Sequence, residues 1–342
     1  MKRTRKKPTT ELVLRLGTRA SALAMVQSKM VAERLERAHR SAKLRVKLVP
    51  ISTHGDKDRR SPLKSFGGTG VFVKELERAL RQKRIDFAVH SLKDLPLRQP
   101  KGLVLATVTK REDVRDVLVT RAGIQLDPHC VVGTGSPRRR SQLAVRQPAL
   151  NFVELRGNVE TRLRKVANGE CDATLLAHAG LKRLGWRVPP NGKRLKLPKT
   201  KASLRLQVLS LARMLPAAGQ GALGLECRSD DRRTRRLLSV LNDEATALAV
   251  ATERACLASL GGGCDLPLGT CARINRASGQ VTLQAVLALP DGQGKALVKL
   301  HGGLKGARQL GQRAGQTLRR SPVGKALRNA ACIHTDSASR IQ

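Results

Sequence analysis

Ile85-Asp86-Phe87-Ala88-Val89-His90-Ser91-Leu92-Lys93-Asp94-Leu95-Pro96 begins as an apolar run of strand length and turns polar at His90. Pro96 ends regular structure soon afterwards, because proline has no backbone N–H to donate. In α/β proteins the carboxyl end of a strand is where ligands are met. The stretch therefore predicts a buried strand that presents the carboxylate of Asp94 at its end. Taken alone, the stretch is more typical of a solvated Lys-Asp turn, since loops are polar by default.

The residues around this strand predict two successive α/β units. In the first, strands are expected at 11–16, 44–51 and 85–90, with helices at 17–35 and 71–83 between them. The pattern begins again near Asp113, with strands at 116–120, 130–133, 152–155 and 172–177. Because strands and helices alternate in the first unit, we expect its sheet to be largely parallel. The polar, Gly-rich loop at 52–70 is long for a connection, which favours a lid or binding loop.

The last third of the chain predicts a separate α+β unit. Two helices (232–241 and 243–260), three antiparallel strands (268–274, 280–289 and 295–301) and two closing helices follow in order. Before it, the basic run Arg187 to Gln207 interrupts the second α/β unit and is expected to be a surface insertion, followed by a helix at 208–215. We expect three domains: residues 11–110 with 210–228, residues 111–209, and residues 229–335.

The composition limits the class of ligand. The chain has 66 Lys plus Arg against 26 Asp plus Glu, a net charge of +40, which implies a polyanionic partner or an acidic substrate. Nucleic acid is the first candidate, but the aromatic residues that stack single-stranded bases are only 1% of the chain. The basic residues are also spread over the whole chain. We therefore expect no specific nucleic-acid partner.

The cysteines and histidines predict no metal site. The 7 cysteines include no C-x-x-C pair, and the 7 histidines are scattered. An odd number of cysteines, with no secretory signal recognised, predicts reduced thiols in the cytoplasm. No apolar run approaches the ~20 residues of a membrane span, so no membrane partner is expected.

Arginines recur at the starts of predicted helices in both α/β units, at positions 19, 138, 139, 156 and 162. A helix N-terminus offers unpaired N–H groups, and a guanidinium binds a carboxylate through two parallel hydrogen bonds. A solvated basic face would explain any one of these arginines. Their recurrence predicts a cleft between the two units, lined by sites for a small ligand with several anionic groups.

The loop Gly261-Gly262-Gly263-Cys264 places a thiol beside three residues without side chains. Glycines allow a backbone to approach another group closely. The thiol of Cys264 is therefore either a nucleophile or attachment point, or a buried structural cysteine. Spacing alone leaves both readings open.

Together these motifs resemble the porphobilinogen deaminase (hydroxymethylbilane synthase) family. The matching stretches, in family order, are Val89–Pro96, Arg156-Gly157-Asn158, Thr161-Arg162-Leu163, Ala179–Gly185, Gly219-Gln220-Gly221-Ala222, Glu253-Arg254-Ala255 and Leu260–Pro267. The resemblance covers roughly residues 11 to 330. It implies two α/β domains, similar to periplasmic binding proteins, around a cleft, and a small α+β domain that carries the cysteine.

The resemblance also implies a reaction and a cofactor. Members of the family condense four porphobilinogen molecules head to tail into hydroxymethylbilane, with release of four ammonia, in the biosynthesis of tetrapyrroles such as haem and chlorophyll. A dipyrromethane cofactor, held through a thioether to the loop cysteine (here Cys264), primes the chain and is not released. The expected partners are porphobilinogen and the growing polypyrrole, and we expect a monomer in the cytoplasm.

Site residues follow from the resemblance, position by position. Asp94 matches the catalytic aspartate, whose carboxylate can stabilise the cation formed when ammonia leaves and can move protons. The substrate carries an acetate and a propionate, so a growing chain is a polyanion that arginines would bind. The residues expected to contact cofactor or substrate are Arg19, Ser21, Gln27, Lys93, Thr134, Ser136, Arg138, Arg139, Arg156, Gly157, Arg162, Arg183 and Gln220.

Some positions depart from the family pattern. Ser65 and Thr69 stand in the 52–70 loop where relatives often have lysines, and Gly135 and Pro137 replace the usual Ser and Leu before the arginine pair. The alternative to an enzyme is a non-catalytic, two-lobed binding protein for a small polyanionic ligand. Such a protein would need the arginines but neither Asp94 nor Cys264, and it would normally carry an export signal.

Overall fold

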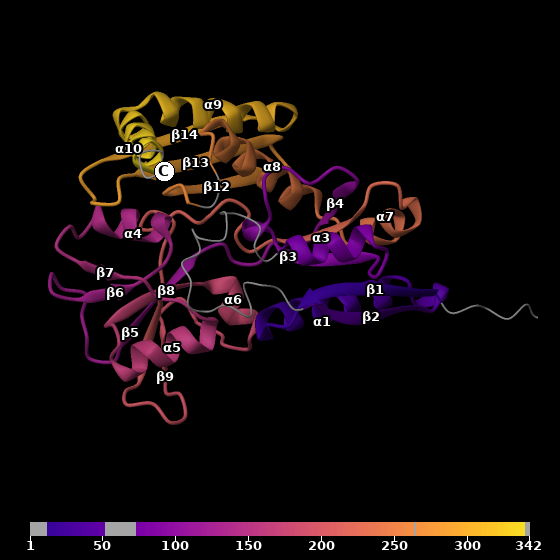
Figure 1. Ribbon diagram of the computed structural model, residues 1–342, viewed down its shortest axis with the longest axis horizontal. Coiled ribbons are helices and arrows are strands. Elements are labelled where there is room, and N and C mark those ends of the chain that lie inside the picture. Colours follow the sequence, from indigo (N-terminus) through magenta and orange to yellow (C-terminus); the bar gives the residue numbers. More distant parts are fainter. Residues whose placement is uncertain (1–11, 52–72, 263–264, 339–342) are drawn as a thin grey trace, which may run out of the picture.

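The computed structural model describes residues 12–51, 73–262 and 265–338, which form three sheets with helices packed on them. Figure 1 shows two α/β units beside each other and a third unit above them. The expected fold class, two α/β units followed by a small α+β unit, is confirmed. Within the described ranges, no helix is both long and apolar enough to cross a membrane.

The first unit has a five-stranded sheet in the order β2-β1-β3-β11-β4. Its elements are β1 (Leu12–Arg19), α1 (Ala22–Ala38), β2 (Leu44–Ile51), α3 (Lys74–Arg81), β3 (Phe87–Ser91), β4 (Leu103–Val108) and β11 (Leu223–Arg228). Strand β1 pairs in parallel with β2 and β3, as expected, whereas β11 is antiparallel to both β3 and β4. The parallel arrangement expected for these first strands is confirmed, and within the described sheet β11 runs against the other strands because it returns from the second unit in the opposite direction.

The second unit has a six-stranded sheet in the order β7-β6-β8-β5-β10-β9. Its elements are β5 (Asp116–Arg121), β6 (Val131–Gly133), α4 (Pro137–Ala144), β7 (Asn151–Val153), α5 (Val159–Asn168), β8 (Ala173–Ala177), α6 (His178–Arg183), β9 (Lys193–Leu195) and β10 (Leu204–Val208). Strand β6 is parallel to β7 and β8, and the pairs β5–β8, β5–β10 and β9–β10 are antiparallel. This sheet is mixed, because β5 and β9 run against its other described strands.

The basic run at 187–207 is not merely a surface insertion. It contains β9 and most of β10, which extend the second sheet, and Leu204 and Leu206 are fully buried in that unit's core. The helix expected at 208–215 is absent, because Val208 ends β10 and residues 211–213 form a turn. Arg205 lies between these two leucines, and Lys193 and Arg194 lie on β9. All three basic side chains face solvent.

The third unit is a three-stranded antiparallel sheet, β12 (Leu268–Asn275), β13 (Gln280–Ala288) and β14 (Lys295–Gly303), as expected. The remaining helices are α7 (Arg232–Ser239), α8 (Glu244–Ser259), α9 (Ala307–Arg320) and α10 (Pro322–Ala338). Helices α8 and α9 pack closely: a Cβ at Gly311 of α9 would lie 2.1 Å from the carbonyl oxygen of Thr252 on α8. Helix α7 packs elsewhere, with Leu238 in the core of the first unit.

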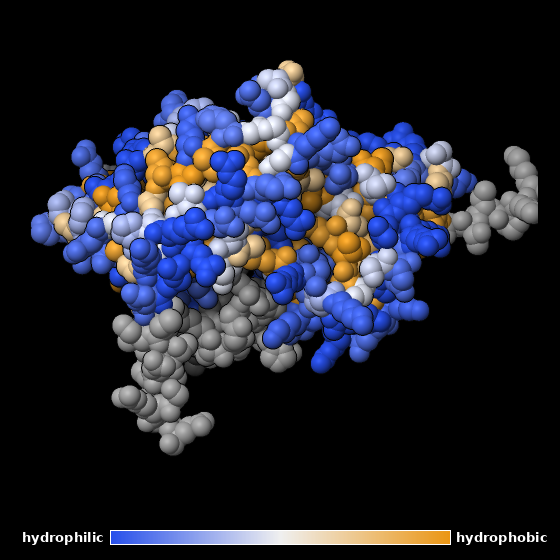
Figure 2. Space-filling model, turned by 90° about the horizontal axis from the view of Figure 1, so that it is seen from above, coloured by the Kyte–Doolittle hydropathy of each residue, from blue (hydrophilic) through white to orange (hydrophobic). Residues whose placement is uncertain are grey.

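Two connections join the α/β units, one from β4 to β5 (109–115) and one from β10 to β11 (209–222). The units also touch directly where Leu23 of α1 packs against Gly180 of α6. In Figure 2, which looks down from above, hydrophilic side chains cover most of the visible face and separate smaller hydrophobic patches.

Candidate active site

Asp94 lies at the end of β3, in the 3-10 turn Leu92–Asp94. Leu92 and Leu95 on either side of it are buried, and the N–H of Leu92 donates to the carbonyl of Ala222 at 3.1 Å. Between these two leucines, which point into the core, Lys93 is half-buried. Asp94 is exposed, in the position that the strand pattern predicts.

The start of α1 lies beside this turn. Ser21 caps α1 by accepting the N–H of Ala24, and Arg19 ends β1, the parallel neighbour of β3. The side-chain amide of Gln27 donates to the hydroxyl of Ser91 at 3.1 Å. Parallel neighbours end at the same edge of a sheet, so Arg19, Ser21 and Gln27 belong to the same edge as Asp94.

Asp116, the first residue of β5, is the centre of a buried charged group that the sequence did not predict. Its carboxylate is 0% exposed and accepts hydrogen bonds from Arg138 at 2.7 Å and Arg139 at 2.8 Å. Gln220 donates to the same carboxylate at 3.2 Å and to the carbonyl of Val114 at 2.7 Å. Against the cost of burial, the two guanidinium groups hold the pKa of Asp116 well below its usual range.

Arg138 and Arg139 were expected to bind ligand carboxylates, and both are already paired inside the protein. Arg138 also donates to the carbonyl of Leu215, and Arg139 to that of Leu175. Two cations share one carboxylate, so a unit of positive charge stays uncompensated within this group. The pair therefore contributes a fixed positive field, with both guanidinium groups held in place.

Arg156, Gly157 and Arg162 lie at the start of α5. Asn158 caps the helix by accepting the N–H of Thr161, and Gly157 has φ +111°, a conformation that side chains disfavour. Arg162 donates through Nε to the carbonyl of Gly157 at 2.8 Å. The turn thus holds Arg162 against its own backbone, with Nη1 and Nη2 still available on the guanidinium.

Charges from both α/β units meet at this point. Burial lowers the pKa of Arg162 to about 10, Arg139 and Arg156 act in the same direction, and Asp94 of the first unit opposes them. Burial likewise lowers the pKa of Lys93, which lies in the fields of Asp94, Arg138 and Arg139. We call the group formed by Lys93, Asp94, Asp116, Arg138, Arg139, Arg156 and Arg162 the charged cluster.

The N-terminus of α4 adds polar groups next to Arg138 and Arg139. Ser136 precedes the helix but makes no side-chain capping bond, and its N–H donates to the hydroxyl of Thr134 at 3.2 Å. The positive end of the helix dipole is therefore not neutralised by its own cap. Thr134 and Ser136 are placed where a ligand anion at this helix end would meet them.

Two family models match the chain. The model described as porphobilinogen deaminase, dipyromethane cofactor binding domain, matches residues 14–236, and the model described as porphobilinogen deaminase, C-terminal domain, matches residues 247–320. The chain belongs to the porphobilinogen deaminase family. It is accordingly an enzyme of tetrapyrrole synthesis with a dipyrromethane cofactor and porphobilinogen as its substrate.

Three of the solved structures that are similar to this chain illustrate the range of matches. They are the BenM effector-binding domain with benzoate (15% identity, covering 67% of this chain and 89% of that chain, TM-score 0.38), the periplasmic VFT2 domain of BvgS from Bordetella pertussis (16%, 66% and 85%, 0.38) and the putative sulfonate-binding protein SsuA from Methylobacillus flagellatus KT (14%, 71% and 67%, 0.38).

Other expected residues of this deaminase lie away from the charged cluster or outside the described ranges. Arg183 on α6 donates to the carbonyl of Gly221 at 2.6 Å, and burial lowers its pKa to about 10. The charges that act on its pKa are those of Glu112 and Arg34, which are not members of the cluster. Cys264, Ser65 and Thr69 lie outside the described residues, so their roles stay predictions.

A second buried carboxylate, Glu253 of α8, joins all three units of the deaminase, and it too was not predicted as a site residue. It accepts two hydrogen bonds from Arg111 at 2.7 and 3.0 Å, one from the N–H of Gly219 and one from the N–H of Ala272. Arg111 also donates from Nε to the carbonyl of Gln220 at 2.7 Å. Both connections between the α/β units are thereby tied to α8.

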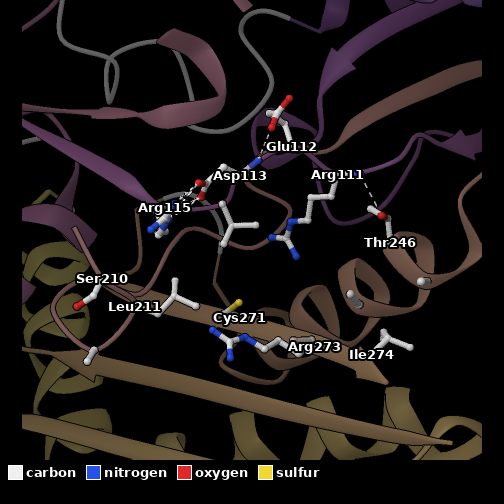
Figure 3. Close-up of a pocket in the computed structure, with 15 residues that line it drawn as sticks. Arg111, Glu112, Asp113, Arg115, Ser210, Leu211, Thr246, Cys271, Arg273 and Ile274 are labelled. Carbon is white, nitrogen blue, oxygen red and sulfur yellow. Dashed lines mark hydrogen bonds and ion pairs between the residues drawn. The ribbon is translucent and has the colours of Figure 1, made fainter. Parts of the chain in front are cut away.

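A pocket of about 750 Å³ opens beside this junction. Figure 3 shows Arg111 pointing into it, with Arg115 and Arg273 near its rim and the thiol of Cys271 below. Burial raises the pKa of Cys271 to about 11, so this thiol is protonated at neutral pH. No member of the charged cluster lines the pocket, and we assign it no part in the reaction. Within the described residues, no group of three metal-ligating side chains occurs.

Proposed function

We propose that this protein is a hydroxymethylbilane synthase, which condenses four porphobilinogen molecules head to tail with release of four ammonia. The observation that carries the proposal is the position of Asp94. An exposed carboxylate stands at a strand end of one unit, in the field of Arg162 from the other unit and beside Lys93. A binding site for a polyanion needs no carboxylate there, whereas a reaction that passes through cations does.

The donors around Asp94 fit a polyanionic cofactor and product. In the charged cluster, the cations Lys93, Arg138, Arg139, Arg156 and Arg162 outnumber the carboxylates Asp94 and Asp116, and Glu154 pairs with Arg156 at its outer side. The uncapped start of α4 adds further N–H donors. Acetate and propionate groups would bind to these donors, because each guanidinium can take a carboxylate through two hydrogen bonds.

The reaction needs one group that can stabilise two successive cations. Loss of ammonia from porphobilinogen leaves a cationic methylene-pyrrolenine, and the pyrrole that attacks it then becomes cationic and must lose a proton. A carboxylate between them stabilises both cations and accepts that proton. Asp94 is suited to this role because its backbone is fixed by buried Leu92 and Leu95 while its side chain is exposed.

When bound, the dipyrromethane supplies the pyrrole end from which the product is built. Helix α8 ends at Ser259, and the chain then runs through Gly262 to Cys264, which we propose as the attachment point. Gly262 and Asp265, the described residues on either side of it, belong to the third unit. Arg19, Ser21, Gln27, Thr134, Ser136 and Gly157 are proposed to contact cofactor or substrate from the two α/β units.

The test is product formation by Asp94→Asn, which removes the charge but keeps the shape. We expect turnover to fall by at least ~100-fold, as for the loss of a general acid–base group. The matched control is Asp291→Asn, since Asp291 is likewise an exposed carboxylate but lies in the β13–β14 turn, where it accepts the N–H of Gln293. Hydroxymethylbilane and ammonia are measured for both variants and the wild type.

The intact masses of the same samples complete the experiment. The wild type and Asp291→Asn are expected to exceed their sequence masses by two linked pyrrole units, and Cys264→Ala is expected to lack this addition. If the wild type carries the bare sequence mass after growth in cells that make porphobilinogen, covalent attachment is wrong. If Asp94→Asn turns over like the wild type, Asp94 has no part in the mechanism.

A further inference from the structure

Arg254 of α8 contacts the backbone that directly follows Asp94. Its Nη1 donates to the carbonyl of Leu95 at 3.0 Å, and its Nη2 donates to the carbonyl of Pro96. The side chain is half-buried and comes from the third unit, whereas the turn belongs to the first. One guanidinium therefore spans the boundary between the two units at the site of the reacting carboxylate.

The geometry of this contact makes it stiff. A guanidinium is planar, and its two Nη groups hold two acceptors at a fixed separation. Pro96 has no backbone N–H, so its peptide cannot be tied by a donor of its own. On the other side of Asp94, Leu92 is held by Ala222 within the first unit. The turn is thus held by two units: by the first through Ala222, and by the third through Arg254.

The helix that carries Arg254 is itself immobilised. The preceding residue, Glu253, binds Arg111 and the N–H groups of Gly219 and Ala272. On the opposite side, α8 packs so tightly on α9 that a Cβ at Gly315 would lie 2.3 Å from the carbonyl of Cys256. Helix α8 therefore behaves as a rigid element, and a displacement of α8 would move Arg254 by the same amount.

The same helix leads into the loop of Cys264. Only nine residues lie between Arg254 and Cys264 in the sequence, and the first five of them belong to α8. The Asp94 turn and the start of the cysteine loop are thus both connected to one rigid helix. We propose that Arg254 is a positioning residue. It fixes the position of Asp94 relative to the cysteine loop, so that the carboxylate lies next to the reacting end of the growing polypyrrole.

This inference rests on the proposed function, because it assigns Arg254 a part in that reaction. A misplacement of about 1 Å at a reacting group costs on the order of 100-fold in rate. Arg254→Lys keeps the charge but loses the planar pair of donors. We expect its kcat to fall about 10-fold or more with KM changed less than about 3-fold, and Arg254→Ala to fall further.

The matched control is Arg146→Lys. Arg146 also donates to two successive backbone carbonyls, those of Ala212 and Arg213, but it follows α4 and lies outside the charged cluster. We expect its kcat and KM to stay within about 2-fold of the wild type. The comparison separates the general cost of losing an arginine–carbonyl contact from the cost of losing this one.

Two further measurements distinguish positioning from other roles. Millimolar methylguanidinium, supplied to Arg254→Ala, should restore part of kcat by refilling the site. Amide hydrogen exchange in the peptide that contains Leu95 and Leu97 should be faster in Arg254→Ala, while exchange in β3 stays unchanged. The exchange experiment needs no turnover, so it tests the contact even if the proposed reaction is wrong.

Three results would overturn the inference. A raised KM with unchanged kcat would make Arg254 a binding group for substrate carboxylates. Equal losses in Arg146→Lys and Arg254→Lys would make the effect one of general stability. Unchanged exchange around Leu95 would show that Arg254 does not hold this turn. By contrast, a wild type that makes no hydroxymethylbilane would refute the proposed function while leaving the exchange result intact.

Discussion

Asp116 and Glu253 are two fully buried carboxylates whose negative charges are compensated in different ways. Glu253 meets one guanidinium, that of Arg111, and its remaining lone pairs accept backbone N–H groups. Asp116 meets two guanidinium groups, those of Arg138 and Arg139, and an amide. The first arrangement is neutral and joins three units. The second keeps excess positive charge next to Asp94, which is what an anion-binding site requires.

The largest effect is expected from Asp116→Asn. Breaking a buried ion pair by removing one partner costs about 3–5 kcal/mol, and here two guanidinium groups would lose their counter-charge. The free energy of unfolding, measured by urea titration, should fall by at least that amount. Turnover per folded molecule should also fall, since Arg138 and Arg139 would no longer be held in place.

The pH dependence provides the control for this variant. The folded-state pKa of Asp116 is depressed, so its ionised form adds stability above the unfolded pKa of about 3.9, and this contribution is lost as pH falls toward the folded pKa. The stability gap between wild type and Asp116→Asn should therefore be largest near neutral pH and shrink below about pH 4. A gap that stays constant with pH would show that the charge of Asp116 is not what stabilises the group.

The second effect, from Glu253→Gln, should be mainly structural. Glutamine keeps one oxygen acceptor for the N–H groups of Gly219 or Ala272 but leaves Arg111 without its counter-charge, which costs about 2–3 kcal/mol. Turnover per folded molecule should fall less than in Asp116→Asn, since the charged cluster is intact. If Glu253→Gln lost as much turnover as Asp116→Asn at an equal folded fraction, the role of Glu253 would not be mainly structural.

The sequence was sufficient where a residue's neighbours along the chain decide its environment. The run Ile85–Val89 is mostly apolar and of strand length, and polar residues and a proline follow it, so both β3 and the exposed position of Asp94 could be predicted. Leu204, Leu206 and Val208 also alternate with polar residues, as a half-buried strand requires. This alternation predicts a strand, but the basic side chains around it favour a surface insertion, and for that reason the sequence alone does not predict β10.

The two buried carboxylates could not be recognised in the same way. Asp116 is 22 residues from Arg138 and 104 from Gln220, and nothing near it in the chain marks it as buried. Glu253 lies on a helix, where an acidic residue usually faces solvent, and its partner Arg111 is 142 residues away. Only the three-dimensional fold brings such partners together, so the arginines of the site were predictable and the carboxylate that holds two of them was not.

The smallest effect is expected where the ion pair of the site is exposed. Glu154 is 57% exposed and accepts from Nε of Arg156 at 2.6 Å, at the outer side of the charged cluster. Because exposed pairs contribute about 0–1 kcal/mol, Glu154→Gln should change the free energy of unfolding by less than about 1 kcal/mol. It should nevertheless lower KM for porphobilinogen up to a few-fold, since the cluster loses a competing negative charge. A higher KM, measured at low ionic strength where the effect is strongest, would mean that Glu154 orients Arg156 for the substrate rather than competes with it.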